Sequence, residues 1–212
     1  MPDARRLPMF PLGTVLFPYA MLPLHVFETR YRMMVRECLR TDQEFGVVLI
    51  ERGSEVGGGD TRFDTGTIAR IVQAAELPDG RYALASVGTK RIRVERWLPD
   101  DPYPQAEVVE AGDAPLDADA YAQALDRRAR VDTALRRLLA LWSTFDARVS
   151  EIVVALDDDP ARAVYEAAAL TPLGPLDAQR VLEAHGTLER YARLEAILAD
   201  EIALLEARGS EP

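Results

Sequence analysis

The stretch FPLGTVLFPYAMLPLHVFETRYRMMV, residues 10–35, decides the fold of the first half of the chain. It is strongly apolar, yet prolines at positions 11, 18 and 23 interrupt it. A proline in a helix interior removes a backbone donor and costs about 3 kcal/mol, so no long helix crosses this run. The same prolines argue against a membrane span and against a secretory signal peptide. We therefore expect two or three short strands here, followed by one helix over residues 28–39.

Composition places the chain among ordinary globular proteins. Of its 212 residues, 48% are hydrophobic and 28% are charged, which are typical values. The single cysteine excludes an internal disulfide and a zinc site built from several thiolates, so the cytoplasm is the expected location. The net charge of -10 argues against a general nucleic-acid binder, because such proteins neutralise phosphates with Lys and Arg.

The two halves of the chain differ in pattern. Residues 1–110 carry 14 basic and 16 acidic side chains, whereas residues 111–212 carry 11 and 19. Before this boundary, short apolar runs alternate with period two, which predicts strands. Asp79-Gly80 predicts a hairpin turn, and Gly88 predicts a second tight connection within VGTKRIRV.

After the boundary the period becomes helical. Asp117 or Asp119 is expected to cap the first helix, and Asp159 is expected to cap a later helix with a proline at its first position. The segment at residues 146–157 is read as helical too, and a last helix is expected from residue 187 onward. The predicted fold class is α+β, with a β-rich domain at residues 1–111 that holds one short helix, followed by an α-helical bundle at residues 112–212.

Residues able to carry chemistry are few. Lys90 is the only lysine and lies in a strand pattern, which excludes a Walker A motif and leaves no context for a Ser-Lys peptidase dyad. His25 and His185 are expected to be structural. Cys38 lies on the apolar stripe of its helix, and buried cysteines are normally inert.

Three further patterns have structural interpretations. The glycine-rich segment at residues 52–66 is expected to be a loop, because no helix signal and no G-K-[ST] ending follow it. The three aspartates at 157–159 fit helix capping better than a calcium loop. The basic run KRIRVER at residues 90–96 fits a solvated sheet face better than an RNA contact. We thus predict no catalytic, cofactor or metal site.

A family resemblance adds to this reading. The segments LPMFPLGTVLFPYAMLPLHVFETRYRMMV, FGVVLI, GTIARIVQAAELPDGRYALASVGTKRIRVERW and PYPQAEVVE follow one another in the order found in the amino-terminal substrate-recognition domain of Lon proteases. The resemblance implies a PUA-like pseudo-barrel joined to helices. It also implies a free-standing recognition domain without the Lon ATPase and Ser-Lys protease modules, and therefore no enzymatic activity.

The resulting hypothesis is a non-catalytic protein-interaction module that binds unfolded or hydrophobic polypeptide segments, or one specific partner such as a protease or a chaperone ATPase. The candidate contact residues, expected to be exposed, are Phe17, Tyr19, Met21 and Trp97. One alternative is a small molecule or RNA bound by the barrel near the glycine-rich loop, although the acidity of the chain argues against RNA. Another alternative is a hydrolase.

Overall fold

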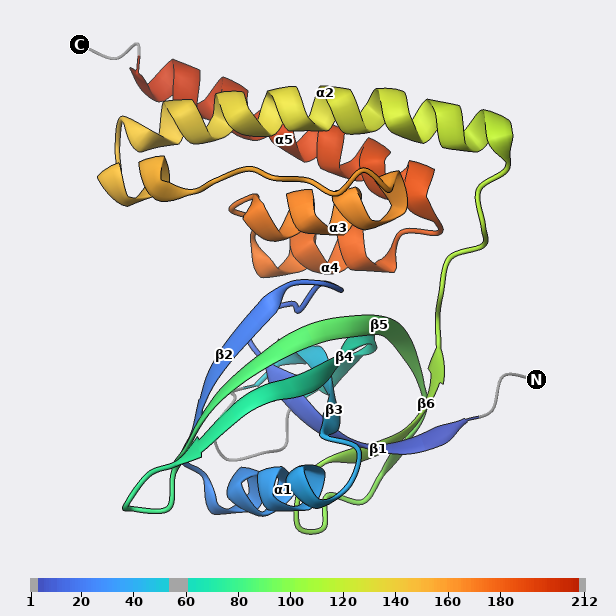
Figure 1. The fold of residues 1–212 in the computed structure, drawn as a ribbon, viewed down its shortest axis with the longest axis vertical. Coiled ribbons are helices and arrows are strands. Elements are labelled where there is room, and N and C mark those ends of the chain that lie inside the picture. The colour runs from blue at the N-terminus through green and yellow to red at the C-terminus, as the bar shows by residue number, and fades with distance from the viewer. Residues whose placement is uncertain (1–3, 54–60, 210–212) are drawn as a thin grey trace. The chain divides into compact units, whose positions relative to one another are not determined.

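The protein is described by a computed structural model that covers residues 4–53 and 61–209 (Figure 1). These residues form two compact units, one ending at Gly112 and one beginning at Asp113, called unit 1 and unit 2 below. The glycine-rich prediction falls partly on residues 54–60, outside the described residues. Its last part is a strand instead of a loop, since β4 already begins at Thr61.

Unit 1 combines a six-stranded mixed sheet with helix α1 (Thr29–Arg40), which agrees with the α+β prediction. The strands are β1 (Arg5–Leu12), β2 (Met21–Val26), β3 (Glu44–Arg52), β4 (Thr61–Glu76), β5 (Tyr82–Leu98) and β6 (Gln105–Glu110). Their order in the sheet is β2-β5-β4-β3-β1-β6, and β5 also pairs with β6. The pairings β5–β4–β3–β1–β6 therefore return to β5, with β2 attached outside this ring.

The opening stretch folds as its prolines predict. It forms the two strands β1 and β2, and Pro23 lies in β2, which pairs with a neighbour on one side only. A proline has no amide hydrogen to donate to a neighbouring strand, so it is tolerated in an edge strand, which has one side without a neighbour. The predicted helix is confirmed as α1, and its buried Tyr31 stacks on Phe10 with 4.1 Å between ring centroids.

Two glycines that looked alike in the sequence have different roles. Gly80 has φ of 77° in the turn between β4 and β5, so the predicted hairpin is confirmed. The tight connection predicted at Gly88 is wrong, because β5 runs without interruption from Tyr82 to Leu98. A Cβ atom at Gly88 would lie 2.2 Å from the Phe17 carbonyl oxygen. Glycine is required there by the close approach of another backbone segment.

Unit 2 consists of α2 (Ala118–Ser143), the short 3₁₀ helix η1 (Ala147–Glu151), α3 (Pro160–Leu170), α4 (Pro175–Glu183) and α5 (Thr187–Gly209). Asp117 and Asp159 accept hydrogen bonds at the starts of α2 and α3. Of the two candidates for the first cap, Asp117 is the cap and Asp119 lies in the first turn, and the cap predicted at Asp159 is confirmed. The helical reading of residues 146–157 is wrong beyond η1. From Ile152 the chain is irregular, and its carbonyls receive hydrogen bonds from arginines of α2. No helix within the described ranges is long and apolar enough to cross a membrane.

Candidate protein-binding surface

The loop at residues 13–20 carries two of the four candidate contact residues, Phe17 and Tyr19, and is fixed to β5. The Tyr19 amide donates to the Gly88 carbonyl at 2.8 Å, and the Gly88 amide donates to the Ala20 carbonyl at 2.9 Å. Phe17 is only 4% exposed. The expectation that Phe17 is an exposed contact is therefore wrong, because its ring is packed inside and anchors the loop instead.

Tyr19 and Met21 are both exposed, at 44% and 60% of their surface. Tyr19 has φ of 68°, a left-handed conformation that costs a non-glycine residue about 1–2 kcal/mol. Strained residues of this kind gather at functional sites. The loop thus holds an aromatic ring at the surface, next to the first residue of β2.

Met21 belongs to a wider surface, the outer side of β2, β5 and β4, which we call the β2 face. Residues directly opposite in an antiparallel pair share a face, so the register of the three strands defines its members. They are Met21, Pro23, His25, Ala83, Ala85, Val87, Arg70, Gln73 and Ala75. All are exposed or half-exposed.

The β2 face carries little charge. Its one arginine, Arg70, pairs with Glu44 at 2.9 Å. Burial raises the pKa of the Glu44 carboxyl, but hydrogen bonds from Arg5 and Arg70 outweigh this effect, and the pKa is lowered overall. A bulge between Ile71 and Gln73 leaves Val72 exposed beside these residues. The face therefore presents apolar side chains to solvent beside a neutralised ion pair.

Trp97 lies elsewhere. It is ten residues beyond Val87, which corresponds to about 33 Å of chain length along β5 at the usual rise of a strand. Its indole nitrogen donates to Asp64 at 3.2 Å, and the Arg62 guanidinium lies 4.7 Å from the ring centroid. Tyr19 and Met21 are therefore both exposed and only two residues apart, whereas Phe17 is buried and Trp97 lies outside the β2 face.

Cys38 and His25 lie in different surroundings. Cys38 is buried in the core, its thiol 3.4 Å from the Glu44 carbonyl oxygen, and burial raises its pKa to about 12. His25 is exposed on β2. A thiol of this kind remains protonated at neutral pH and is a poor nucleophile. Over the described part of the chain, no three His, Cys, Asp or Glu side chains are grouped to hold a metal ion.

The basic run of β5 is neutralised by its neighbours. Lys90 pairs with Glu110, Arg93 with Glu95, and Arg96 with Glu107, each at 2.6 Å. The buried side chains Ile92 and Val94 alternate with these exposed ones. As the sequence predicts, this run is a solvated sheet face.

Comparison with known proteins agrees with this architecture. The sequence model of the ATP-dependent protease La (LON) substrate-binding domain matches residues 6–200. The chain belongs to this family. Lon protease 2 of Herpetosiphon aurantiacus is 29% identical over 94% of this chain, which spans about a quarter of that protein. Lon protease of Desulfovibrio desulfuricans is 26% identical over 98% of the chain, again with about a quarter of its own length covered.

Solved structures resemble the Lon substrate-binding domain described above along almost its whole length. A Lon N-terminal domain protein from Xanthomonas campestris has 30% identity and a TM-score of 0.60, covering 92% of this chain and 98% of that one. The N-terminal domain of a Mycobacterium avium complex Lon protease has 17% identity and the same TM-score, covering 94% and 98%. The second likeness is one of fold alone.

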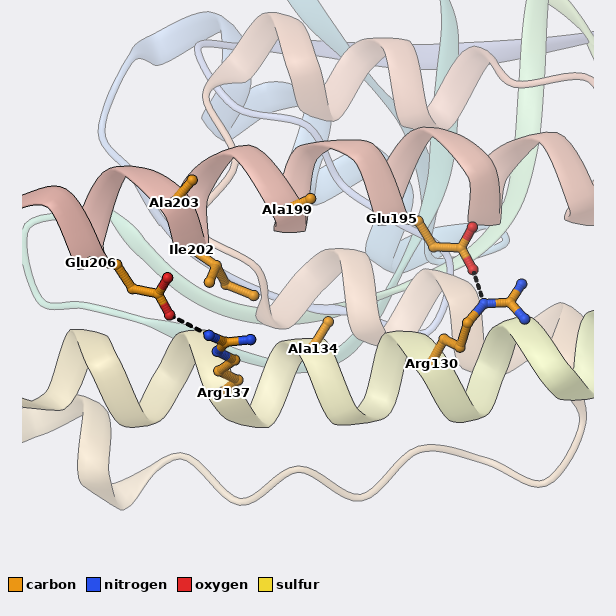
Figure 2. Close-up of a pocket in the computed structure, with 8 residues that line it drawn as sticks. All are labelled: Arg130, Ala134, Arg137, Glu195, Ala199, Ile202, Ala203 and Glu206. Carbon is orange, nitrogen blue, oxygen red and sulfur yellow. Dashed lines mark hydrogen bonds and ion pairs between the residues drawn. The ribbon is translucent and has the colours of Figure 1, made fainter.

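Unit 2 of this Lon-family chain contains a cavity of about 420 Å³ between α2 and α5 (Figure 2). Its floor is apolar and includes Ala134 and Ile202. Two ion pairs cross it, Arg130–Glu195 and Arg137–Glu206. Because these charged groups bind each other, the cavity resembles a helix-packing groove more than a ligand site with free polar groups.

Sequence reasoning missed several residues of the β2 face. Pro23 and His25 share the outer side of β2 with Met21, a placement that the two-residue period of MLPLHV could have indicated. Val72 could not be found in this way, since its exposure depends on a bulge. Val87 and Ala85 required the register between β2 and β5.

Proposed function

We propose that this chain recognises polypeptide segments through the β2 face, without catalysing a reaction. The observation that carries the proposal is the exposure of Met21 beside Pro23 and Val72 on one side of three paired strands, with the exposed Tyr19 two residues before Met21 in the chain. Exposed apolar side chains grouped on one face are typical of protein-binding sites. Membership of the Lon substrate-binding family supports the same role.

The electrostatics of the face support an apolar partner. Covering Arg70 would not strip an isolated charge of water, because Glu44 already neutralises it. The binding free energy would come mainly from removing apolar side chains from water, at about 25 cal/mol per Å². We therefore propose unfolded or hydrophobic segments as the bound class. The partner protein to which the chain delivers the bound segments would be a protease or a chaperone ATPase.

Pro23 favours docking on the face over addition of a strand to the β2 edge. A proline cannot donate a hydrogen bond to an added strand, and natural edge strands use this property to block pairing. Side-chain contacts on the β2 face would then carry the affinity. Tyr and Met are among the side chains enriched at interfaces.

The remaining parts of the proposal concern the fold name and the cellular setting. The ring of pairings from β5 through β4, β3, β1 and β6 supports our assignment of a PUA-like pseudo-barrel to unit 1. The buried, protonated Cys38 supports a non-enzymatic role and a reducing compartment such as the cytoplasm.

The test is a binding titration with a fluorescent, permanently unfolded carboxymethylated protein. We expect Met21→Glu to weaken binding at least tenfold, since it places a charge on the contact surface. Met33→Glu is the matched control, because Met33 is exposed to a similar degree on α1. Equal binding by wild type and both variants, or no binding by wild type, would remove the β2 face as the site.

A further inference from the structure

The segment that links η1 to α3 is an unpaired stretch of extended chain. Residues 152–156, Ile-Val-Val-Ala-Leu, contain three consecutive β-branched side chains. Ile152 has φ of -74° and ψ of 115°, which is extended backbone. Figure 1 shows this part of the chain running nearly straight, and arginines of α2 hold it along that helix.

Only one edge of this segment is hydrogen-bonded. The Val154 carbonyl accepts from Arg136 at 2.9 Å, and the Leu156 carbonyl accepts from Arg128 at 3.0 Å. In extended chain, the peptide groups of residues i and i+2 point to the same edge. Those of Val153 and Ala155 therefore point to the opposite edge. Within the described ranges, neither residue has a hydrogen bond to its backbone amide or carbonyl.

The side chains of neighbouring residues in this segment also differ in burial. Val154 is 9% exposed and anchors the segment, whereas Val153 is 81% exposed. A hollow of about 290 Å³ adjoins them, lined by Leu139, Val149 and Ile152 among others. The segment thus offers two free peptide groups, an exposed valine and, beside it, a hollow in which Arg136 and Ser143 lie among apolar side chains.

We propose that an extended polypeptide with an apolar centre and basic ends adds as a β-strand along the edge formed by Val153 and Ala155. Main-chain hydrogen bonds would supply affinity, and the hollow would hold one apolar side chain. Exposed acidic side chains at the two ends of the segment favour a basic partner. Glu151 precedes the segment and is exposed. Asp158 follows it, within the run of three aspartates at 157–159, and its exposed carboxylate lies 3.5 Å from the Arg128 guanidinium.

The same charges argue against a second copy of this chain as the occupant. Antiparallel pairing of two such segments would place the acidic ends against each other, and like charges directly opposite destabilise a pair of strands. The site is independent of the β2 face, because it lies in unit 2 and uses backbone groups instead of side chains for affinity.

The test uses the full chain and a fluorescein-labelled peptide of sequence Lys-Val-Thr-Val-Thr-Val-Lys. We expect Val153→Pro to weaken binding at least tenfold, because proline removes the outward amide. The fold should tolerate this change, since the amide of Val153 has no internal partner and the extended Ile152 is compatible with a following proline. Val153→Thr is the control, because it keeps the amide and the shape, and it should bind within twofold of wild type.

Two further arms separate this site from others. The same peptide with N-methyl groups on all five central residues, which blocks both of its edges, should lose binding, and the version with Glu at both ends should bind at least tenfold more weakly. The same titration with Met21→Glu separates the two sites: a loss of peptide affinity in Met21→Glu without a loss in Val153→Pro would place the peptide on the β2 face and overturn this proposal. Undiminished binding by a folded Val153→Pro protein, or by the N-methylated peptide, would overturn the proposal.

Discussion

Arg190 is a fully buried guanidinium in unit 2, and Asp113 neutralises it. The two side chains are 2.6 Å apart, and the arginine also donates to the carbonyls of Ala184 and Val181. Its guanidinium carbon lies 4.2 Å from the ring centroid of Tyr165. The first residue of unit 2 is in this way bound to the start of its last helix.

We expect Asp113→Ala to lower the free energy of unfolding by about 3–5 kcal/mol, because it leaves a buried charge without its partner. Urea unfolding followed by circular dichroism measures the change. Glu206→Gln breaks the exposed pair with Arg137 and should cost about 0–1 kcal/mol. Similar small losses in both variants would contradict the assigned role of Arg190.

Cys38 gives a prediction for alkaline pH. Burial raises the pKa of its thiol from an ordinary value of 9.0 to about 12 in the folded protein. Between these values the folded state holds a proton that the unfolded state has released, so stability falls as pH rises, by at most about 1.4 kcal/mol per pH unit. The wild type should therefore lose more stability than Cys38→Ala between pH 9 and pH 11. Parallel slopes for the two proteins in urea titrations would be inconsistent with the raised pKa.

At the scale of elements, the contact between the loop at residues 13–20 and β5 depends on the missing side chain of Gly88. An added methyl group would collide with the Phe17 backbone, which cannot move without breaking the hydrogen bonds at Tyr19 and Ala20. We expect Gly88→Ala to destabilise unit 1 by about 1–3 kcal/mol, the usual cost of overpacking.

The measurement for this variant is thermal unfolding followed by circular dichroism. Gly112→Ala serves as the control, because a Cβ atom there has no neighbour within 4 Å. A Gly88→Ala protein as stable as the control would show that the loop accommodates the methyl group.

Elements with local signals could be predicted from the sequence. Helix α1, the turn at Gly80 and the caps Asp117 and Asp159 each depend on residues close together in the chain. The role of Gly88 could not be predicted, because a glycine needed for a turn and a glycine needed for close approach look the same. The helix predicted for the segment after η1 does not form, because arginines of α2, distant in sequence, donate hydrogen bonds to the carbonyls of this segment.

At the scale of the whole molecule, the division into two domains remains a prediction. Unit 1 has two apolar core clusters of its own, and buried leucines of α2 and α5 pack within unit 2. We expect fragments 1–112 and 113–212 to fold separately, because each includes the strands or helices that cover its core. Circular dichroism of each fragment should show a cooperative thermal transition. A gradual, non-cooperative loss of signal in either fragment would contradict the division.

The candidate site was only partly accessible from sequence. Tyr19 and Met21 are exposed as expected, but Phe17 is buried and Trp97 is about 33 Å along β5 from the β2 face. Period-two patterning separates the two sides of a strand, but it does not say which side another element covers. The register between β2, β5 and β4 supplies that information, and it is a property of the assembled sheet.

The pairing of β1 with β6 has a consequence for synthesis of the chain. Arg5 lies opposite Val108, so the first strand made must wait for the last strand of its unit. At 5–20 residues per second, the ribosome needs about 5–20 s to add the intervening hundred residues. During that time the nascent chain exposes an unpaired strand edge, which is the kind of surface that molecular chaperones cover.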